Sequence, residues 1–112
     1  MLDNITTVTV NGETYPAVCN LRILEQIQKK FGTTKKFIEL MDPKKNEEPD
    51  IGAILYVLPK MILAGMELDK DERRIEIRKE EDIVARLGMN IFQLATVTMR
   101  IYANGFKTIK KQ

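Results

Sequence analysis

The chain has 112 residues, of which 44% are hydrophobic and 30% are charged, and this is the composition of a single soluble globular domain. It contains no His, no Ser and no Trp, and Cys19 is its one cysteine. Catalytic triads built on Ser, or on a Cys and His pair, are therefore excluded within the chain, as are an internal disulfide and a zinc site of Cys and His ligands. The net charge of +2 gives little attraction for polyanions. The composition disfavours an enzyme and predicts neither a cofactor nor a metal.

The N-terminus lacks the positive region and apolar run of a secretory signal, and a lone thiol fits a reducing compartment. We therefore expect a cytoplasmic protein. The most apolar stretch, residues 51–66, is too short for a membrane span and contains Pro59 and Lys60. It is expected to form a buried core helix, with no association with a membrane.

A β-hairpin is predicted at the start of the chain. Residues 5–10 are all β-branched, with threonine and aliphatic side chains in near alternation, and they precede Asn11 and Gly12, the preferred pair for a two-residue type I′ turn. Pro16 cannot donate to a sheet, so the second strand should be short or lie at an edge. Two strands are marginal alone and need support from helices.

The first two helices follow directly. Asn20 is a good N-cap residue, and apolar residues then recur at spacings of three and four up to Gly32, which is placed to end the helix. Thr33 or Thr34 can cap a second, shorter helix that ends at about Met41. Both predictions depend on a cap followed by helical spacing of apolar side chains.

A long central helix is predicted after a polar loop. Residues 42–50 carry two prolines and several charges, which indicates an exposed loop. Asp50 then caps a helix that runs to about Met66 with apolar residues at helical period. Pro59 lies inside this helix and should remove one backbone hydrogen bond and kink the axis, or else split the helix in two.

The charged middle of the chain is less regular. Within residues 69–82, Ile75 and Ile77 alternate with charged residues. This pattern is compatible with either a short strand or a loop, and both predictions stay open. Residues 80–87 predict a short helix with acidic residues in its first turn, as the helix dipole prefers.

The last predicted helix starts at its cap, Asn90, and ends at about Asn104, with Gly105 as the stop. The prediction is thus one α+β domain in which an N-terminal β-hairpin packs on a bundle of four to five α-helices. Its parts are the domain over 1–112, the hairpin over about 5–18, the helical part over about 20–105 and a basic C-terminal tail over 106–112.

Candidate chemical groups are few. The carboxylates of Glu80, Glu81 and Asp82 do not converge on a metal, because adjacent side chains on a helix point about 100° apart. Helix N-terminal electrostatics explains them. Cys19 lies where the first N–H groups of a helix could lower a thiol pKa, but the chain has no His to assist it. We expect a structural, mostly buried cysteine.

Methionines gather on or beside the two most apolar helices. Flexible Met side chains suit surfaces that accept varied partners, although Met more often fills a core, and both interpretations stay open. A small domain without catalytic groups is most simply a protein-binding module. The residues selected as possible partner-binding residues are Met61, Met66, Met99 and Tyr102.

A family resemblance is carried by residues 8–32, VTVNGETYPAVCNLRILEQIQKKFG. The order of strand, Asn-Gly turn, strand and amphipathic helix ending in Phe-Gly resembles the start of small tail assembly chaperones encoded by phages and prophages of Gram-positive bacteria. A later apolar helix over 51–66, a charged middle and a closing helix extend the resemblance to roughly residues 5–105.

The resemblance implies a protein of the host bacterium's cytoplasm that binds the tape-measure protein, recruits tail-tube subunits and is absent from the finished virion. It transfers no catalytic residues. Two alternatives stay open: a small nucleic-acid-binding regulator, which the low net charge disfavours, and a minor structural protein of tail or head completion. A homo-oligomer is a further possibility, since an exposed edge strand invites pairing between copies.

Overall fold

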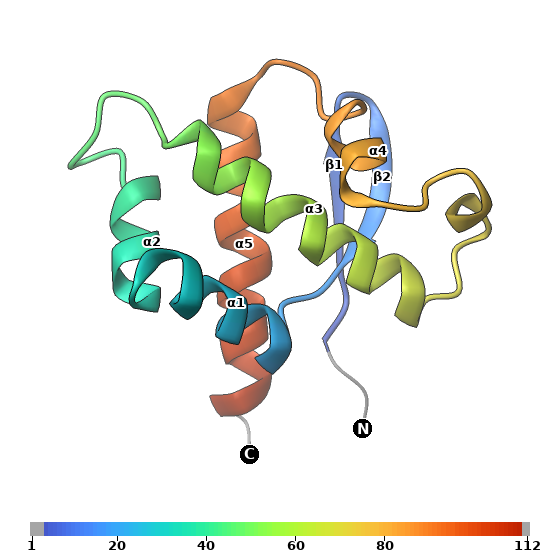
Figure 1. The fold of residues 1–112 in the computed structure, drawn as a ribbon, viewed down its shortest axis with the longest axis horizontal. Helices are drawn as coiled ribbons and strands as arrows, with labels where there is room; N and C mark the ends of the chain where they lie inside the picture. Colours follow the sequence, from blue (N-terminus) through green and yellow to red (C-terminus); the bar gives the residue numbers. More distant parts are fainter. Residues whose placement is uncertain (1–3, 111–112) are drawn as a thin grey trace.

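The computed structural model describes residues 4–110, with side chains up to residue 106. Its elements in chain order are β1 (Thr6–Val10), β2 (Glu13–Ala17), α1 (Leu21–Phe31), α2 (Thr34–Met41), α3 (Ile51–Leu68), the short 3-10 helix η1 (Glu72–Ile75), α4 (Glu80–Val84) and α5 (Ile91–Lys110). Figure 1 shows α3 crossing the middle of the molecule, with the hairpin at one end and α1 and α2 at the other. The predicted α+β fold, a hairpin packed on helices, is confirmed.

The hairpin forms at the predicted turn. Asn11 and Gly12 both have positive φ, 49° and 82°, as a type I′ turn requires. The strands are antiparallel, and Pro16 pairs with Thr7. Counting back from the turn, this pair lies where the two strands do not exchange hydrogen bonds, so the missing N–H of Pro16 costs the ladder nothing.

Helix boundaries follow the predicted caps. The side chains of Asn20, Thr33, Asp50 and Asn90 each accept a hydrogen bond from the backbone N–H three residues further on, at 2.8 to 3.1 Å. Each bond satisfies an N–H group that the helix itself leaves without a partner. The starts of α1, α2, α3 and α5 are therefore explained by single residues of the sequence.

The core is built around α3, which packs against β2, α4, α5 and α1. Pro59 lies inside this helix and is buried, and the helix is not split there. By length and composition α3 could also cross a membrane, but half of it is buried inside the protein. Its place at the centre of a compact fold is consistent with a soluble protein.

The segment between α3 and α4 is a loop with one 3-10 turn and no strand. Ile77 is buried, whereas Ile75 is 74% exposed. Arg73 ties this segment to the hairpin: its guanidinium donates to the carbonyl of Thr14 at 2.9 Å and lies 4.6 Å from the ring centre of Tyr15. Of the two structures left open by the sequence, the loop is the correct one.

The short helix α4 begins where its acidic residues predict. The carboxylate of Asp82 accepts hydrogen bonds from the backbone N–H groups of Arg78 and Lys79, at 2.9 and 3.1 Å, and these bonds lower the pKa of that carboxyl. The helix itself ends at Val84, and residues 85–87 continue as turns. The acidic run therefore has a structural role at the helix start.

The predicted end of the last helix is wrong. Instead of stopping at Gly105 and leaving a tail from residue 106, α5 continues to Lys110, while residues 111–112 lie outside the described residues. Gly105 is the point where α5 passes close to Cys19: a Cβ added there would lie 2.7 Å from the Cys19 carbonyl oxygen. The ring of Phe106 then packs against that of Tyr102 in a tilted arrangement, with ring centres 5.0 Å apart, so the helix stays attached to the core.

Candidate partner-binding site

An apolar pocket lies between the α2–α3 loop and the first half of α5. Its volume is about 320 Å³, and its residues come from segments some fifty positions apart in the chain. The lining of this apolar pocket is Met41, Pro43, Asn46, Glu47, Pro49, Phe92, Ala95, Thr96 and Met99. Most of these side chains are apolar, so the pocket can exclude water from an apolar group that enters it.

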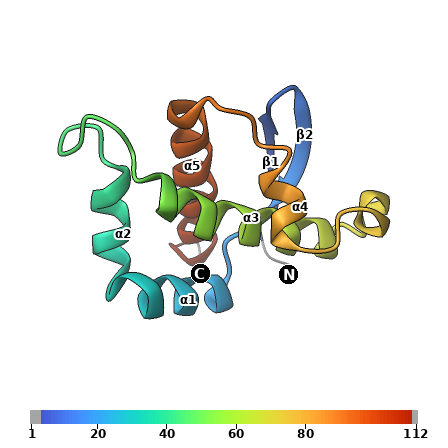
Figure 2. The same cartoon turned by 45° about the horizontal axis from the view of Figure 1, so that its top comes forward.

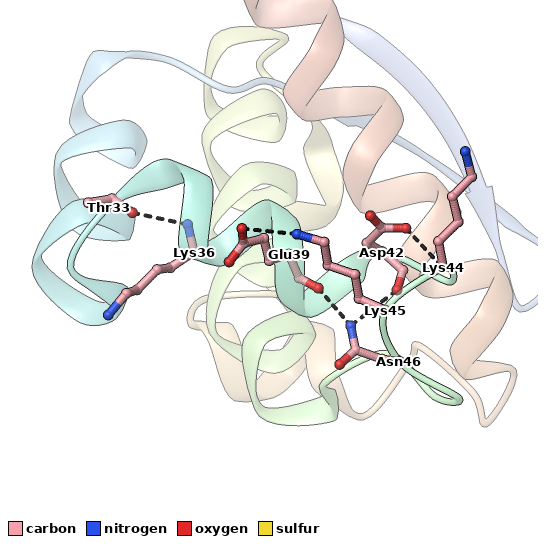
Figure 3. Close-up of polar contacts among 7 residues, drawn as sticks. All are labelled: Thr33, Lys36, Glu39, Asp42, Lys44, Lys45 and Asn46. Atoms are coloured by element: carbon pink, nitrogen blue, oxygen red, sulfur yellow. Dashed lines mark hydrogen bonds and ion pairs between the residues drawn. The ribbon is translucent and has the colours of Figure 1, made fainter.

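Polar contacts fix the loop that forms one wall of the pocket (Figure 3). The side-chain amide of Asn46 donates to the carbonyls of Glu39 and Asp42, at 2.6 and 3.1 Å. The Lys45 ammonium pairs with the Glu39 carboxylate at 3.1 Å, and the backbone N–H of Lys44 donates to the Asp42 carboxylate at 2.8 Å. The loop is therefore held in shape before any partner binds, which lowers the entropy cost of binding.

The opposite wall is the start of α5. Asn90 caps this helix by accepting a hydrogen bond from the Gln93 N–H, and Phe92 lies in its first turn. Phe92 is 59% exposed and Met89, just before the helix, is 92% exposed. Large apolar side chains exposed beside an apolar hollow are a common feature of protein-binding surfaces.

The structure separates the four residues predicted to bind a partner. Met61 and Met66 are fully buried in α3, and Tyr102 is also buried, with its ring 5.8 Å from that of Phe37. Their expected place on a partner-binding surface is wrong, because they fill the core. Met99 alone lines the apolar pocket.

Phe92 and the loop prolines are the site residues that the sequence analysis missed. A signal for Phe92 exists: the buried residues of α5 include Leu94, Val97 and Ile101, and Phe92 lies off that face. An aromatic residue outside the apolar face of an amphipathic helix is a candidate for binding. No comparable signal connects Pro43 or Pro49 to α5.

Chemistry at the pocket is restricted. Glu47 is the one ionisable group in its lining, so the pocket itself offers no acid and base pair. Cys19 is buried elsewhere, and burial raises the pKa of its thiol to about 12, which makes it a poor nucleophile. Among residues 4–106, whose side chains the structure describes, no group of three or more His, Cys, Asp or Glu side chains is placed to hold a metal ion. The arrangement favours binding of apolar side chains.

Comparison of the chain with protein-family models, with curated proteins and with solved structures gives no significant match.

Proposed function

We propose that the chain is a non-enzymatic tail assembly chaperone of a phage or prophage, acting in the cytoplasm of the host bacterium. It binds the tape-measure protein and helps to recruit tail-tube subunits. The observation that carries this proposal is the apolar pocket, in which Met99 and the exposed Phe92 face a preformed loop. The order of strand, Asn-Gly turn, strand and amphipathic helix supports it through resemblance to such chaperones.

The mechanism is transient cover of apolar helix faces. A tape-measure protein is long and helical, and before assembly its apolar stripes are exposed to aggregation. One or two apolar side chains from such a stripe enter the pocket while the helix lies along α5, which is the helix-in-groove mode of recognition. The pocket is at the small end of ligand-binding volumes, so binding at one pocket is weak and reversible, as a chaperone that must later release its client requires.

The first experiment is to sequence the DNA on both sides of the gene and to co-express any long helical reading frame found downstream. The proposal expects that frame's product to become more soluble with the chain present, and the chain to be missing from purified virions. Retention in virions would favour a minor structural tail or head-completion protein instead. An isolated gene among regulators, together with DNA binding that weakens steeply with salt, would overturn the proposal in favour of a nucleic-acid-binding regulator.

A further inference from the structure

The two outer edges of the β-hairpin differ in how they are protected. In β2, Pro16 has no N–H to offer, and the outward carbonyl of Thr14 accepts a hydrogen bond from Arg73 at 2.9 Å. Proline and a covering side chain are two of the devices that close a strand edge against pairing. The outer edge of β2 is therefore closed.

The outer edge of β1 is open. The two-residue turn makes Val10 and Glu13 a pair that exchanges hydrogen bonds. In an antiparallel hairpin such pairs alternate with pairs that exchange none, and Thr9 and Thr7 belong to the second kind. The backbone N–H and C=O groups of Thr7 and Thr9 therefore point away from β2. Among the backbone and side-chain groups that the structure describes, none outside the hairpin forms a hydrogen bond with these four groups. The side chains of Thr7 and Thr9 are also exposed. The edge presents donors and acceptors at the spacing of a β-strand.

This open edge borders a groove. Figures 1 and 2 both show α5 running beside β1, on the side away from β2. The space between them, which we call the β1–α5 groove, has a volume of about 650 Å³. Its lining is Thr7, Thr9, Asn90, Phe92, Gln93, Thr96, Val97 and Arg100.

We propose that the β1–α5 groove is a docking site for an extended peptide segment of a partner protein, which adds to β1 as a third strand. Backbone hydrogen bonds to Thr7 and Thr9 supply the affinity, and alternate side chains of the segment face α5. The inference goes beyond the proposed function, because this groove borders β1 whereas the apolar pocket borders the α2–α3 loop, and their linings share only Phe92 and Thr96.

Side chains along the groove indicate the chemistry of the segment. Phe92 is exposed at one end, and Val97 is buried in the floor. Arg100 is exposed and forms no ion pair with any residue that the structure describes. The complementary segment carries apolar side chains and one carboxylate at alternate positions, so that all of them face α5.

A second copy of the chain fits this groove poorly. Pairing β1 with β1 of another copy would bring that copy's own α5 along with its strand. The space under the added strand already contains the cap residue Asn90 and residues of α5 up to Arg100. An isolated extended segment has no helix of its own to place there, so it is the occupant that the geometry favours.

The test uses a blocked heptapeptide with threonine at every other position and valine, valine and glutamate between them. Titrated into ¹⁵N-labelled protein, it should cause saturable shifts of the Thr7 and Thr9 amide signals and protect both amides from hydrogen exchange. Two N-methylated versions are compared, one methylated at the residues that pair with β1 and one at the residues that face outward. The first should bind at least about tenfold more weakly than the second, because it loses backbone hydrogen bonds to β1.

Two protein variants complete the test. Thr7→Pro removes one outward N–H as Pro16 does in β2, and it should weaken binding, whereas Thr7→Val keeps the N–H and should bind like the original chain. If Thr7→Pro fails to fold, the pair of N-methylated peptides decides alone. Absence of saturable shifts, or equal binding by the two methylated peptides, would overturn the proposal. Shifts of Thr7 and Thr9 that grow with protein concentration in the absence of peptide would show a second copy as the occupant and overturn it as well.

Discussion

At the scale of single residues, Tyr15 has an unusual environment. Its side chain is 1% exposed, and its hydroxyl has no hydrogen-bond partner among the described residues. Burial is the main cause that raises the pKa of Tyr15, because desolvation disfavours the phenolate. The Tyr15 ring contributes to the stability of the fold through its packing and through its contact with the Arg73 guanidinium above it. Neither contribution needs the hydroxyl.

We predict that Tyr15→Phe leaves the fold intact and raises the free energy of unfolding by about 1 kcal/mol, because a buried polar group without a partner costs about 1–3 kcal/mol. Urea unfolding of the two proteins measures the difference. A loss of stability of 1 kcal/mol or more on this substitution would show that the hydroxyl has a partner in solution, such as a buried water.

Cys19 makes stability depend on pH in the alkaline range. Burial raises the pKa of its thiol from 9.0 to about 12, so above pH 9 the unfolded chain loses this proton while the folded chain keeps it. The unfolded state then binds fewer protons, and stability falls as the pH rises. The contribution is complete below pH 9 and is lost by up to about 1.4 kcal/mol per pH unit above it.

The check is to compare urea unfolding of the original chain and of Cys19→Ala between pH 7 and 11. The variant should show a shallower fall above pH 9, with the residual slope coming from Tyr15 and Tyr102, whose pKa values burial also raises. Identical slopes in the two proteins would mean that Cys19 ionises equally well in the folded state.

At the scale of elements, the contact between α3 and β2 depends on one glycine. A Cβ added to Gly65 would lie 2.4 Å from the Cα and 2.5 Å from the N of Ala17. These are backbone atoms of the strand, so neither element can yield by moving a side chain. Just after the strand, the Val18 N–H also donates a hydrogen bond to α3, to the Met61 carbonyl at 3.0 Å.

We predict that Gly65→Ala destabilises the protein by about 3 kcal/mol, since overpacking outweighs the gain in helix propensity of about 1 kcal/mol. The matched control is Gly52→Ala in the exposed first turn of the same helix, where the nearest atom is a side-chain oxygen of Asp50 at 3.2 Å. This control should change stability by less than about 1 kcal/mol. Equal effects of the two substitutions in thermal unfolding would contradict the close contact.

Turns and helix starts that depend on residues close together in the chain could be predicted from the sequence. Boundaries that depend on contacts between distant segments could not. The Asn11-Gly12 turn and the caps Asn20 and Asp50 act within three residues, so their pattern is visible in the chain. Gly105 carries the same signal as a helix stop, but it is there because α5 passes the Cys19 carbonyl. Ile75 and Ile77 alternate like a strand, yet no strand among the described residues pairs with them. In both cases a tertiary contact decides what the local pattern leaves open.

At the scale of the whole molecule, the candidate site depends on the meeting of two distant segments. The α2–α3 loop and the start of α5 form the apolar pocket only after α2 packs beside α5. Methionine content could point to a binding surface, but the sequence could not say which methionines face solvent. Met61 and Met66 are buried in the central helix, while Met99 lines the pocket next to an exposed Phe92.

The most direct test of the proposed function is the affinity of the chain for a tape-measure protein, the partner that the proposal names, determined for two matched variants. Phe92→Asp places a charge at the apolar pocket, and Ile75→Asp makes the same kind of change at a similarly exposed residue of η1, remote from the pocket. We predict that Phe92→Asp weakens binding by at least about tenfold and that Ile75→Asp leaves it unchanged, with both variants as stable as the original chain. Equal affinities of the two variants would show that the partner does not use this pocket.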